Sequence, residues 1–292
     1  MKDKILKILS KNKEIRVFLA KTTDMVECAK VLHNTSKTAT AALGRVLTAN
    51  ALMAADLKSD DNTVSIQIRS EGPIGNIITY ANGKCEVKGY VANPQIELPI
   101  RADGKIDVGG AVTVNGSLTV VKDVGGKEPY SGTIELISGE IAQDLTYYFA
   151  KSEQIPTAIA LGVLVDKDNQ VVLSSGGLMI QLLPDASEET ITKLENILNN
   201  NFSISKLLCE ENYVKKTLEI IFPDKDYEIL EEIYPTLRCD CSKERFLRGI
   251  ISLGKEELKK LVNEEDTITA NCHFCNTSYE FKSEELKQFA EA

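Results

Sequence analysis

Two closely spaced cysteine pairs near the end of the chain have the residue types and spacing to bind a metal. Cys239 and Cys241 form a C-x-C motif, and Cys272 and Cys275 form a C-x-x-C motif, with 30 residues between the two pairs. Four thiolates satisfy the tetrahedral coordination of zinc, and two short chelating loops joined by a helical excursion are typical of small zinc domains. The spacing therefore predicts one Zn²⁺ per chain, bound by all four cysteines.

The predicted site favours redox chemistry over hydrolysis. Because protein ligands fill all four positions, no position is left for a catalytic water, which argues against a zinc hydrolase. Zinc keeps its sulfur ligands deprotonated, and thiolates are the form that reacts with oxidants. Each pair is also close enough for a disulfide, although the C-x-C ring would be strained and easily reduced. A purely structural zinc knuckle is the alternative that spacing alone leaves open.

The remaining reactive residue types offer no second site. Cys28, Cys85 and Cys209 are isolated in sequence, and we expect Cys28 and Cys85 to be small buried hydrophobes. His273 adjoins a predicted ligand, and sequence neighbours rarely bind the same zinc, so we expect it to face solvent. The chain contains no phosphate loop of the form GxxxxGK[ST] and no arguable serine–histidine–acid arrangement. The sequence therefore predicts neither an enzyme nor an ATP-driven cycle.

Composition and hydropathy indicate a cytoplasmic globular protein. The chain has 292 residues, 43% hydrophobic and 26% charged, which is enough to bury a core without help from metal. The longest apolar run, residues 158–165, falls short of the ~20 residues of a membrane helix, and no secretory segment is visible. In the reducing cytoplasm, cysteines are interpreted as metal-binding or catalytic before they are interpreted as structural disulfides.

The negative charge is concentrated in one stretch. Residues 1–184 carry 20 Lys/Arg against 20 Asp/Glu, residues 185–236 carry 5 against 12, and residues 237–292 carry 9 against 11, which sums to −9. Phosphate contacts need clustered Lys and Arg, so this distribution argues against a nucleic-acid partner and disfavours a zinc-ribbon nucleic-acid module. A thiol oxidoreductase built on Cys272 and Cys275 is a further alternative, disfavoured because the pair lacks thioredoxin-like surroundings.

Periodicity and turn residues predict an α+β protein in three parts. An N-terminal mixed α/β domain with antiparallel sheets covers residues 1–184, an acidic and largely helical linker covers 185–236, and a small zinc-binding domain covers 237–292. In the first part, residues 36–57 suit a buried helix and residues 63–69 alternate as a strand. Asn82-Gly83 and Asn115-Gly116 predict hairpins, the second between strands 111–114 and 117–121, and Gly176-Gly177 suggests a sharp bend.

The second and third parts have weaker patterns. Asp185 or Ser187 can cap a helix at the start of the linker. Residues 204–235 mix acidic residues with isolated apolar clusters, which indicates either ordinary surface helices or a segment of marginal stability. In the zinc-binding part, Ser242 can cap a short helix, residues 255–262 suit a second helix, and strands at 267–270 and 278–281 flank the C-x-x-C motif.

The chain resembles the thirty-three-kilodalton chaperonin family, the bacterial redox-regulated heat-shock chaperones. The similarity covers nearly the whole length in the same order. Two departures, Lys88 in place of a common Arg and Ser175-Gly-Gly-Leu178 in place of the usual Ala-Gly-Gly-Phe, touch none of the cysteines. The stretches that carry it are Ala42-Leu-Gly-Arg45, Glu71-Gly-Pro-Ile-Gly75, Val87-Lys-Gly-Tyr-Val91, Ser138-Gly-Glu-Ile-Ala142, Leu145-Thr-Tyr-Tyr148, Gln154-Ile-Pro156, Gln181-Leu-Leu-Pro184, Cys239-Asp-Cys-Ser-Lys-Glu-Arg245, Ser252-Leu-Gly-Lys-Glu-Glu-Leu258 and Cys272-His-Phe-Cys-Asn276.

This resemblance implies an ATP-independent holdase that binds unfolding client proteins. In the reduced state the four cysteines would bind zinc and the protein would be an inactive monomer. Oxidation would join Cys239 to Cys241 and Cys272 to Cys275 and release the zinc. The tail and the acidic linker would then lose structure, expose apolar surface to clients and permit formation of a homodimer.

Overall fold

The computed structural model describes residues 2–168, 171–184, 186–199 and 204–291 and divides into two compact units. The units are Met1–Leu237, which contains two large sheets, and Arg238–Ala292, which contains the paired cysteines. The predicted α+β class, with antiparallel sheets and a small C-terminal cysteine-bearing part, is confirmed. The predicted linker lies within the first unit, so the three-part division stays a prediction. Asp185, at its start, lies outside the described residues.

Two sheets, which we call sheet A and sheet B, build the first unit. Sheet A has five antiparallel strands in the order β10-β1-β2-β9-β8. Sheet B has six strands in the order β11-β5-β4-β3-β6-β7, all antiparallel to their neighbours except β11, which is parallel to β5. The strands of sheet A are β1 (Lys4–Ser10), β2 (Ile15–Lys21), β8 (Thr157–Val165), β9 (Val172–Leu182) and β10 (Tyr227–Ile233). Those of sheet B are β3 (Thr63–Ser70), β4 (Ile77–Asn82), β5 (Glu86–Val91), β6 (Gly116–Asp123), β7 (Tyr130–Glu135) and β11 (Thr236–Leu237).

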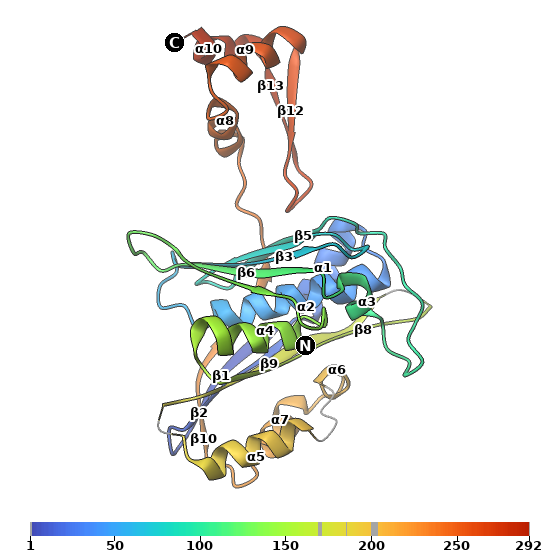
Figure 1. Cartoon of the computed structure of the whole chain (residues 1–292), viewed down its shortest axis with the longest axis vertical. Helices are drawn as coiled ribbons and strands as arrows, with labels where there is room; N and C mark the ends of the chain where they lie inside the picture. Colours follow the sequence, from blue (N-terminus) through green and yellow to red (C-terminus); the bar gives the residue numbers. More distant parts are fainter. Residues whose placement is uncertain (1, 169–170, 185, 200–203, 292) are drawn as a thin grey trace. The chain divides into compact units, whose positions relative to one another are not determined.

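A buried helix, α2 (Lys37–Ala54), lies between the two sheets (Figure 1). Its small side chains let neighbouring elements approach closely. At Gly44, a Cβ atom would come within 2.7 Å of Val26 on α1 (Thr23–His33), so glycine permits this helix–helix contact. The predicted buried helix is confirmed. Among the described residues, no helix is both long and apolar enough to cross a membrane.

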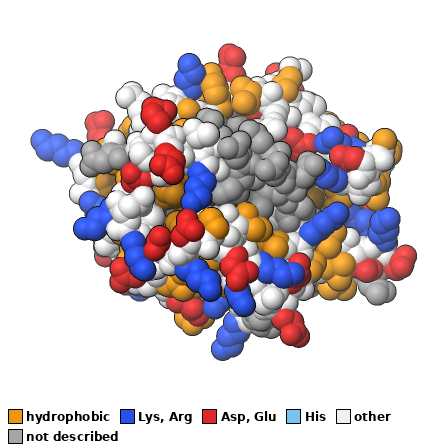
Figure 2. All heavy atoms as spheres, turned by 90° about the horizontal axis from the view of Figure 1, so that it is seen from below, with side chains coloured by type: hydrophobic (Ala, Val, Ile, Leu, Met, Phe, Trp, Pro, Cys, Tyr) orange, Lys and Arg blue, Asp and Glu red, His pale blue; other side chains and the backbone are white. Residues whose placement is uncertain are grey.

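Sheet A is apolar on both faces. In β2, Phe18 belongs to the cluster around α2, whereas Val17 and Leu19 belong to a second cluster on the opposite face. Three helices cover that opposite face (Figure 1): α5 (Glu188–Asn199), α6 (Ile204–Leu207) and α7 (Tyr213–Ile221). The buried residues from this helical side are Leu194, Ile204, Leu208, Tyr213, Leu218, Ile221 and Phe222. The outer surface on this side carries acidic and basic side chains interspersed with apolar ones (Figure 2).

The acidic segment ends in two strands, where the sequence indicated either surface helices or a segment of marginal stability. β10 pairs antiparallel with β1 at the edge of sheet A, and β11 pairs parallel with β5 at the edge of sheet B. All five residues from Glu228 to Glu232 are exposed, so β10 lacks the alternation of a half-buried strand that would have identified it. Backbone pairing and the ion pair between Lys4 and Glu232, 3.2 Å between Nζ and Oε2, attach it to β1.

The predicted hairpin at Asn115-Gly116 is wrong. Residues 108–112 form the short helix α3 (Val108–Val112), capped by Asp107, whose carboxylate accepts the Gly110 N–H at 2.9 Å. Strand β6 pairs instead with β3 and β7. Glycine is required at position 116 because a Cβ there would lie 2.1 Å from the Arg69 carbonyl oxygen, not because a hairpin turns there.

The predicted bend at Gly176-Gly177 is also absent, because β9 runs without interruption through both glycines. A Cβ at Gly176 would lie 2.2 Å from the Ala20 carbonyl oxygen and 2.4 Å from the Leu208 side chain. Gly176 therefore allows close packing of β9 against β2 and against Leu208, the residue after α6, and neither glycine turns the chain.

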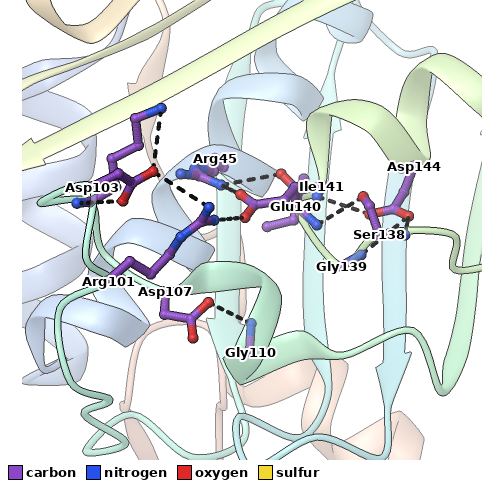
Figure 3. Close-up of polar contacts among 11 residues, drawn as sticks. Arg45, Arg101, Asp103, Asp107, Gly110, Ser138, Gly139, Glu140, Ile141 and Asp144 are labelled. Carbon is purple, nitrogen blue, oxygen red and sulfur yellow. Dashed lines mark hydrogen bonds and ion pairs between the residues drawn. The ribbon is translucent and has the colours of Figure 1, made fainter.

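A single buried carboxylate organises the loop that precedes α4 (Ala142–Tyr148). Asp144 accepts the backbone N–H groups of Ser138 and Ile141, each at 2.9 Å, and the Ser138 hydroxyl at 3.2 Å (Figure 3). Ile141 has a φ of 68°, a left-handed conformation that is strained for a β-branched residue. Hydrogen bonds to a charged acceptor are about twice as strong as neutral ones, and here they offset that strain.

The same loop places Glu140 between two arginines. The Glu140 carboxylate accepts Arg45 Nη1 of α2 at 2.7 Å and Arg101 Nη1 of the 92–107 loop at 2.9 Å (Figure 3). Asp144 thus holds a turn that connects three segments distant in sequence. The residues of this network are distant in sequence from the paired cysteines, and the network stabilises the first unit.

We expect Asp144→Asn to lower the free energy of unfolding of the first unit by about 2–3 kcal/mol, because the buried N–H groups lose a charged acceptor. Urea denaturation followed by circular dichroism measures the change. The matched control is Asp123→Asn, at an exposed position where the carboxylate accepts one N–H from Gly125, with an expected change within about 0.5 kcal/mol. Equal small effects of the two substitutions would contradict the assigned role.

The second unit has a small core. It consists of α8 (Lys243–Ile251), α9 (Lys255–Glu264), the antiparallel pair β12 (Thr267–Asn271) and β13 (Ser278–Lys282), and α10 (Ser283–Glu291). The two predicted helices and two predicted strands are present, and α10 was not predicted. The buried residues of its apolar cluster are Ile250, Leu258, Val262, Ile268, Phe281 and Leu286. A unit of this size usually needs a metal or disulfide for stability.

Candidate metal centre

The structure brings the four paired cysteines together. The sulfur atoms of Cys239, Cys241, Cys272 and Cys275 all lie within 4.8 Å of one another. The Cys239 and Cys272 sulfurs are 3.7 Å apart, and the Cys241 and Cys275 sulfurs are 3.3 Å apart, so each motif contacts the other through two sulfur pairs. Tetrahedral zinc with bonds of about 2.3 Å separates its sulfur ligands by about 3.8 Å. The geometry can therefore hold one metal ion, and the donor set fits zinc.

The C-x-C motif lies directly before α8, and the start of that helix orients it. Ser242 caps α8 by accepting the Arg245 N–H at 3.3 Å, as predicted. The Arg245 guanidinium then turns back and binds the carboxylate of Asp240, the residue between the two cysteines. The helix start thereby fixes the backbone that carries Cys239 and Cys241.

The C-x-x-C motif forms the tip of the β12–β13 hairpin. The Cys272 carbonyl accepts the N–H groups of Cys275 at 3.3 Å and Asn276 at 2.7 Å, and the Cys272 N–H donates to the Thr277 carbonyl at 2.9 Å. Asn276 has a φ of 58°, the left-handed conformation that asparagine tolerates better than most residues. This tight turn points both cysteine side chains toward the C-x-C motif.

Two hydroxyl groups contact the cluster, and sequence reasoning missed both. Tyr279 Oη lies 3.1 Å from the Cys241 sulfur, and Thr277 Oγ1 lies 3.2 Å from the Cys275 sulfur. Tyr279 shares the inner face of β13 with the buried Phe281. Alternation along the strand that follows the C-x-x-C motif was the available signal, since it places Tyr279 on the same side as the small core.

The four thiols differ in their environments. Burial raises the pKa of Cys239, and burial also raises the pKa of Cys272. For Cys275, burial opposes ionisation, but hydrogen bonds with the hydroxyl and backbone of Thr277, together with neighbouring Cys241, lower the pKa to about 7. A cation bound by all four sulfurs would remove these differences, because coordinating thiols are deprotonated.

The other cysteines and His273 lie outside the cluster. His273 is exposed, as predicted. Cys85 is buried, as predicted, and burial raises its pKa to about 12, which is typical of an inert structural thiol. Cys28 is exposed on α1, so the prediction that it would be buried is wrong. Cys209 is also exposed.

Among the described residues, the four paired cysteines form the one cluster of three or more Cys, His, Asp or Glu side chains that could hold a metal ion.

We expect Asn276→Ala to weaken metal binding by about fivefold to tenfold, because alanine pays about 1 kcal/mol or more to adopt the left-handed conformation of the turn. Competition with a chromogenic chelator measures the affinity. Asn276→Gly is the matched control, since glycine adopts this conformation without strain and should stay within about twofold of the unchanged chain. Similar affinities for the two variants would show that the turn does not position the sulfurs.

Three comparisons relate the chain to known proteins. A family model described as Hsp33 protein matches residues 3–282. The 33 kDa chaperonin of Thermoanaerobacter sp. strain X514 is 45% identical over 288 residues, which cover 99% of this chain and 98% of the relative. The 33 kDa chaperonin of Clostridium perfringens strain 13 is 44% identical over 292 residues, which cover 100% and 91%.

A solved structure is similar over nearly its full length as well. The crystal structure of the 33 kDa chaperonin from Thermotoga maritima, a heat shock protein 33 homologue, matches with a TM-score of 0.87 and 36% sequence identity. The match covers 100% of this chain and 98% of that one. The agreement in sequence and in fold therefore extends through both compact units.

Proposed function

The chain belongs to the Hsp33 family, and from this membership we propose that it is a redox-regulated, ATP-independent holdase that binds unfolding proteins during oxidative stress. The name of its relatives, 33 kDa chaperonin, supports the general function of a chaperone, which acts by binding and not by catalysis. The observation that carries the redox part is the convergence of Cys239, Cys241, Cys272 and Cys275 within 4.8 Å. Such a protein would work in the cytoplasm, where thiols are kept reduced until an oxidant arrives.

In the proposed resting state, the four cysteines bind one Zn²⁺ and the chain is an inactive monomer. Zinc, when bound, keeps the four sulfurs as thiolates and ties the C-x-C segment to the β12–β13 hairpin. By analogy with zinc-finger peptides, such binding contributes ~10 kcal/mol or more to folding. A core of six buried residues in the second unit makes this contribution decisive for its stability.

In the proposed active state, Cys239 pairs with Cys241 and Cys272 pairs with Cys275 in two disulfides, and zinc is released. The contacts that join the two motifs are then lost, and the second unit loses its main constraint. Arg238 alone separates β11 from Cys239. Unfolding of the tail would therefore remove the folded structure that directly follows β11 and β10, the edge strands of sheets B and A. This continuity supports propagation of unfolding into residues 185–236.

The second apolar face of sheet A is the surface that release of the linker would expose. Helices α5, α6 and α7 cover it, and their removal would uncover buried side chains of three strands. These side chains are Leu6, Ile8, Ile15, Val17, Leu19, Leu178 and Ile180. Contiguous apolar surface of this kind binds the exposed hydrophobic segments of unfolding proteins. It also supports formation of a homodimer in the oxidised state.

The acidic character of the linker supports the same proposal. Residues 185–236 carry 12 acidic against 5 basic side chains. Like-charge repulsion weakens a compact segment and keeps its extended form soluble. The linker therefore combines modest stability when folded with solubility when released.

The first test is a measurement of zinc and chaperone activity on one sample. The reduced chain should contain one zinc per molecule and should not suppress aggregation of a thermally unfolding enzyme. Hydrogen peroxide with mild heat should release the zinc, remove four free thiols and produce suppression at near-equimolar ratios. Dithiothreitol with added zinc is the reversal control. Release of zinc without any effect on aggregation would rule out the proposed chaperone switch.

A second test concerns the linker. Leu218 in α7 is 2% exposed and packs in the cluster on sheet A. Leu218→Ala should therefore lower the free energy that holds the linker on sheet A by about 2–5 kcal/mol. We expect faster proteolysis between residues 186 and 237 and partial suppression of aggregation in the reduced, zinc-loaded chain. Ile220→Ala, two residues away and 39% exposed, is the matched control and should leave both unchanged. A loosened linker without chaperone activity would contradict the proposed role of this surface.

A further inference from the structure

Tyr279 connects the small core of the second unit to one sulfur of the cysteine cluster. Its hydroxyl oxygen lies 3.1 Å from the Cys241 sulfur. The cluster has one comparable contact on the other motif, between the Thr277 hydroxyl and the Cys275 sulfur at 3.2 Å. Each C-x-C or C-x-x-C pair therefore contains one sulfur with a hydroxyl beside it.

The position of the Tyr279 hydroxyl is fixed by packing. Its ring lies against that of Phe246, with ring centroids 5.0 Å apart and planes inclined by 33°. Phe246 is on α8, one turn after the Ser242 cap, and Tyr279 is paired with Ala270 across the hairpin. The ring is thus held between a helix and a strand, and its hydroxyl is directed at the sulfur by elements that also form the apolar core.

A hydroxyl group in this position changes the chemistry of a thiolate. Once Cys241 is deprotonated, its sulfur can only accept, so Tyr279 must be the donor. The hydrogen bond withdraws charge from the sulfur lone pair that attacks an oxidant. A peroxide oxygen bonds to that sulfur as the O–O bond breaks, giving a sulfenic acid and hydroxide. The partner thiolate then attacks the sulfenic sulfur and displaces a second hydroxide, which forms the disulfide.

We propose that Tyr279 is a positioning residue of the thiol switch, which holds the Cys241 sulfur by a hydrogen bond and raises the oxidant exposure needed to open the site. This inference rests on the proposed function, because it takes the four sulfurs as the zinc-bound, oxidisable group. The hydroxyl has two effects, and both favour the zinc-bound state. It strengthens metal binding by orienting a ligand, and it slows oxidation at Cys241.

The test uses Tyr279→Phe in the full reduced, zinc-loaded chain, because phenylalanine keeps the ring and its contact with Phe246 and removes only the hydroxyl. Hydrogen peroxide is the oxidant, a chromogenic chelator reports zinc release, and alkylation with mass spectrometry reports oxidation at each cysteine. We expect roughly tenfold weaker zinc binding, as is typical when a group that orients a metal ligand is lost. We also expect faster zinc release, with the gain in oxidation rate concentrated in the pair Cys239 and Cys241, because attack at Cys241 ends in their disulfide.

Two further variants make the test specific. Thr277→Val removes the other hydroxyl at nearly constant volume and should accelerate oxidation of the pair Cys272 and Cys275 and leave the pair Cys239 and Cys241 unchanged. Tyr234→Phe removes an exposed tyrosine hydroxyl that bonds to Glu232 in the first unit, and it should change neither rate nor affinity. The crossed pattern between the two cysteine pairs is a signature that general loosening of the unit cannot produce.

Unchanged zinc affinity and unchanged oxidation at Cys241 in Tyr279→Phe would overturn the inference. Uniform acceleration at all four cysteines, together with a lower melting temperature, would overturn it too, because the tyrosine would then be only a packing residue. A normal chain that contains no zinc would instead overturn the proposed function. A zinc-loaded chain that is indifferent to Tyr279→Phe would leave the proposed function intact and remove only the role of Tyr279.

Discussion

A β-sheet that is apolar on both faces must be covered on both, and sheet A imposes this requirement on the first unit. One face packs on α2, together with sheet B, in a core built from the N-terminal part of the chain. The other face depends on α5, α6 and α7, which come from the acidic segment before the cysteines. Residues 1–184 therefore include a surface that they do not cover with their own elements. This dependence links the fold to the proposed function.

The covering segment and the cysteine cluster are continuous in the chain. The segment ends with β10 and β11, which add an edge strand to each sheet, and Cys239 follows after one residue. The side chains of β10 are mostly exposed, so burial contributes little to its attachment. Backbone pairing and ion pairs such as that of Lys4 with Glu232 hold it in place. Edge strands held in this way separate more readily than central ones. In the proposed function, a change at the sulfurs acts first on these weak attachments of the covering segment.

The sequence predicted the elements that have strong local signals. The buried helix α2, the hairpin at Asn82-Gly83, the Ser242 cap and the strands around the C-x-x-C motif all follow from periodicity or turn chemistry. It failed where a glycine serves tertiary contact. Gly116 and Gly176 resemble turn residues, but each is needed because a carbonyl oxygen of another strand lies where its Cβ would be. Cys28 was also predicted incorrectly, since a helical pattern does not say which helix face is covered.

By itself, the sequence determined which four cysteines could share a metal, because C-x-C and C-x-x-C spacing limits each pair to short chelating loops. It also determined that the stretch before them is acidic and only intermittently apolar. The tertiary structure decided what surrounds the sulfurs and what the acidic stretch covers. Tyr279 reaches Cys241 only because α8 and β13 pack together, and β10 is a strand only because β1 offers it a free edge. Such contacts join residues distant in the chain, so no local pattern encodes them.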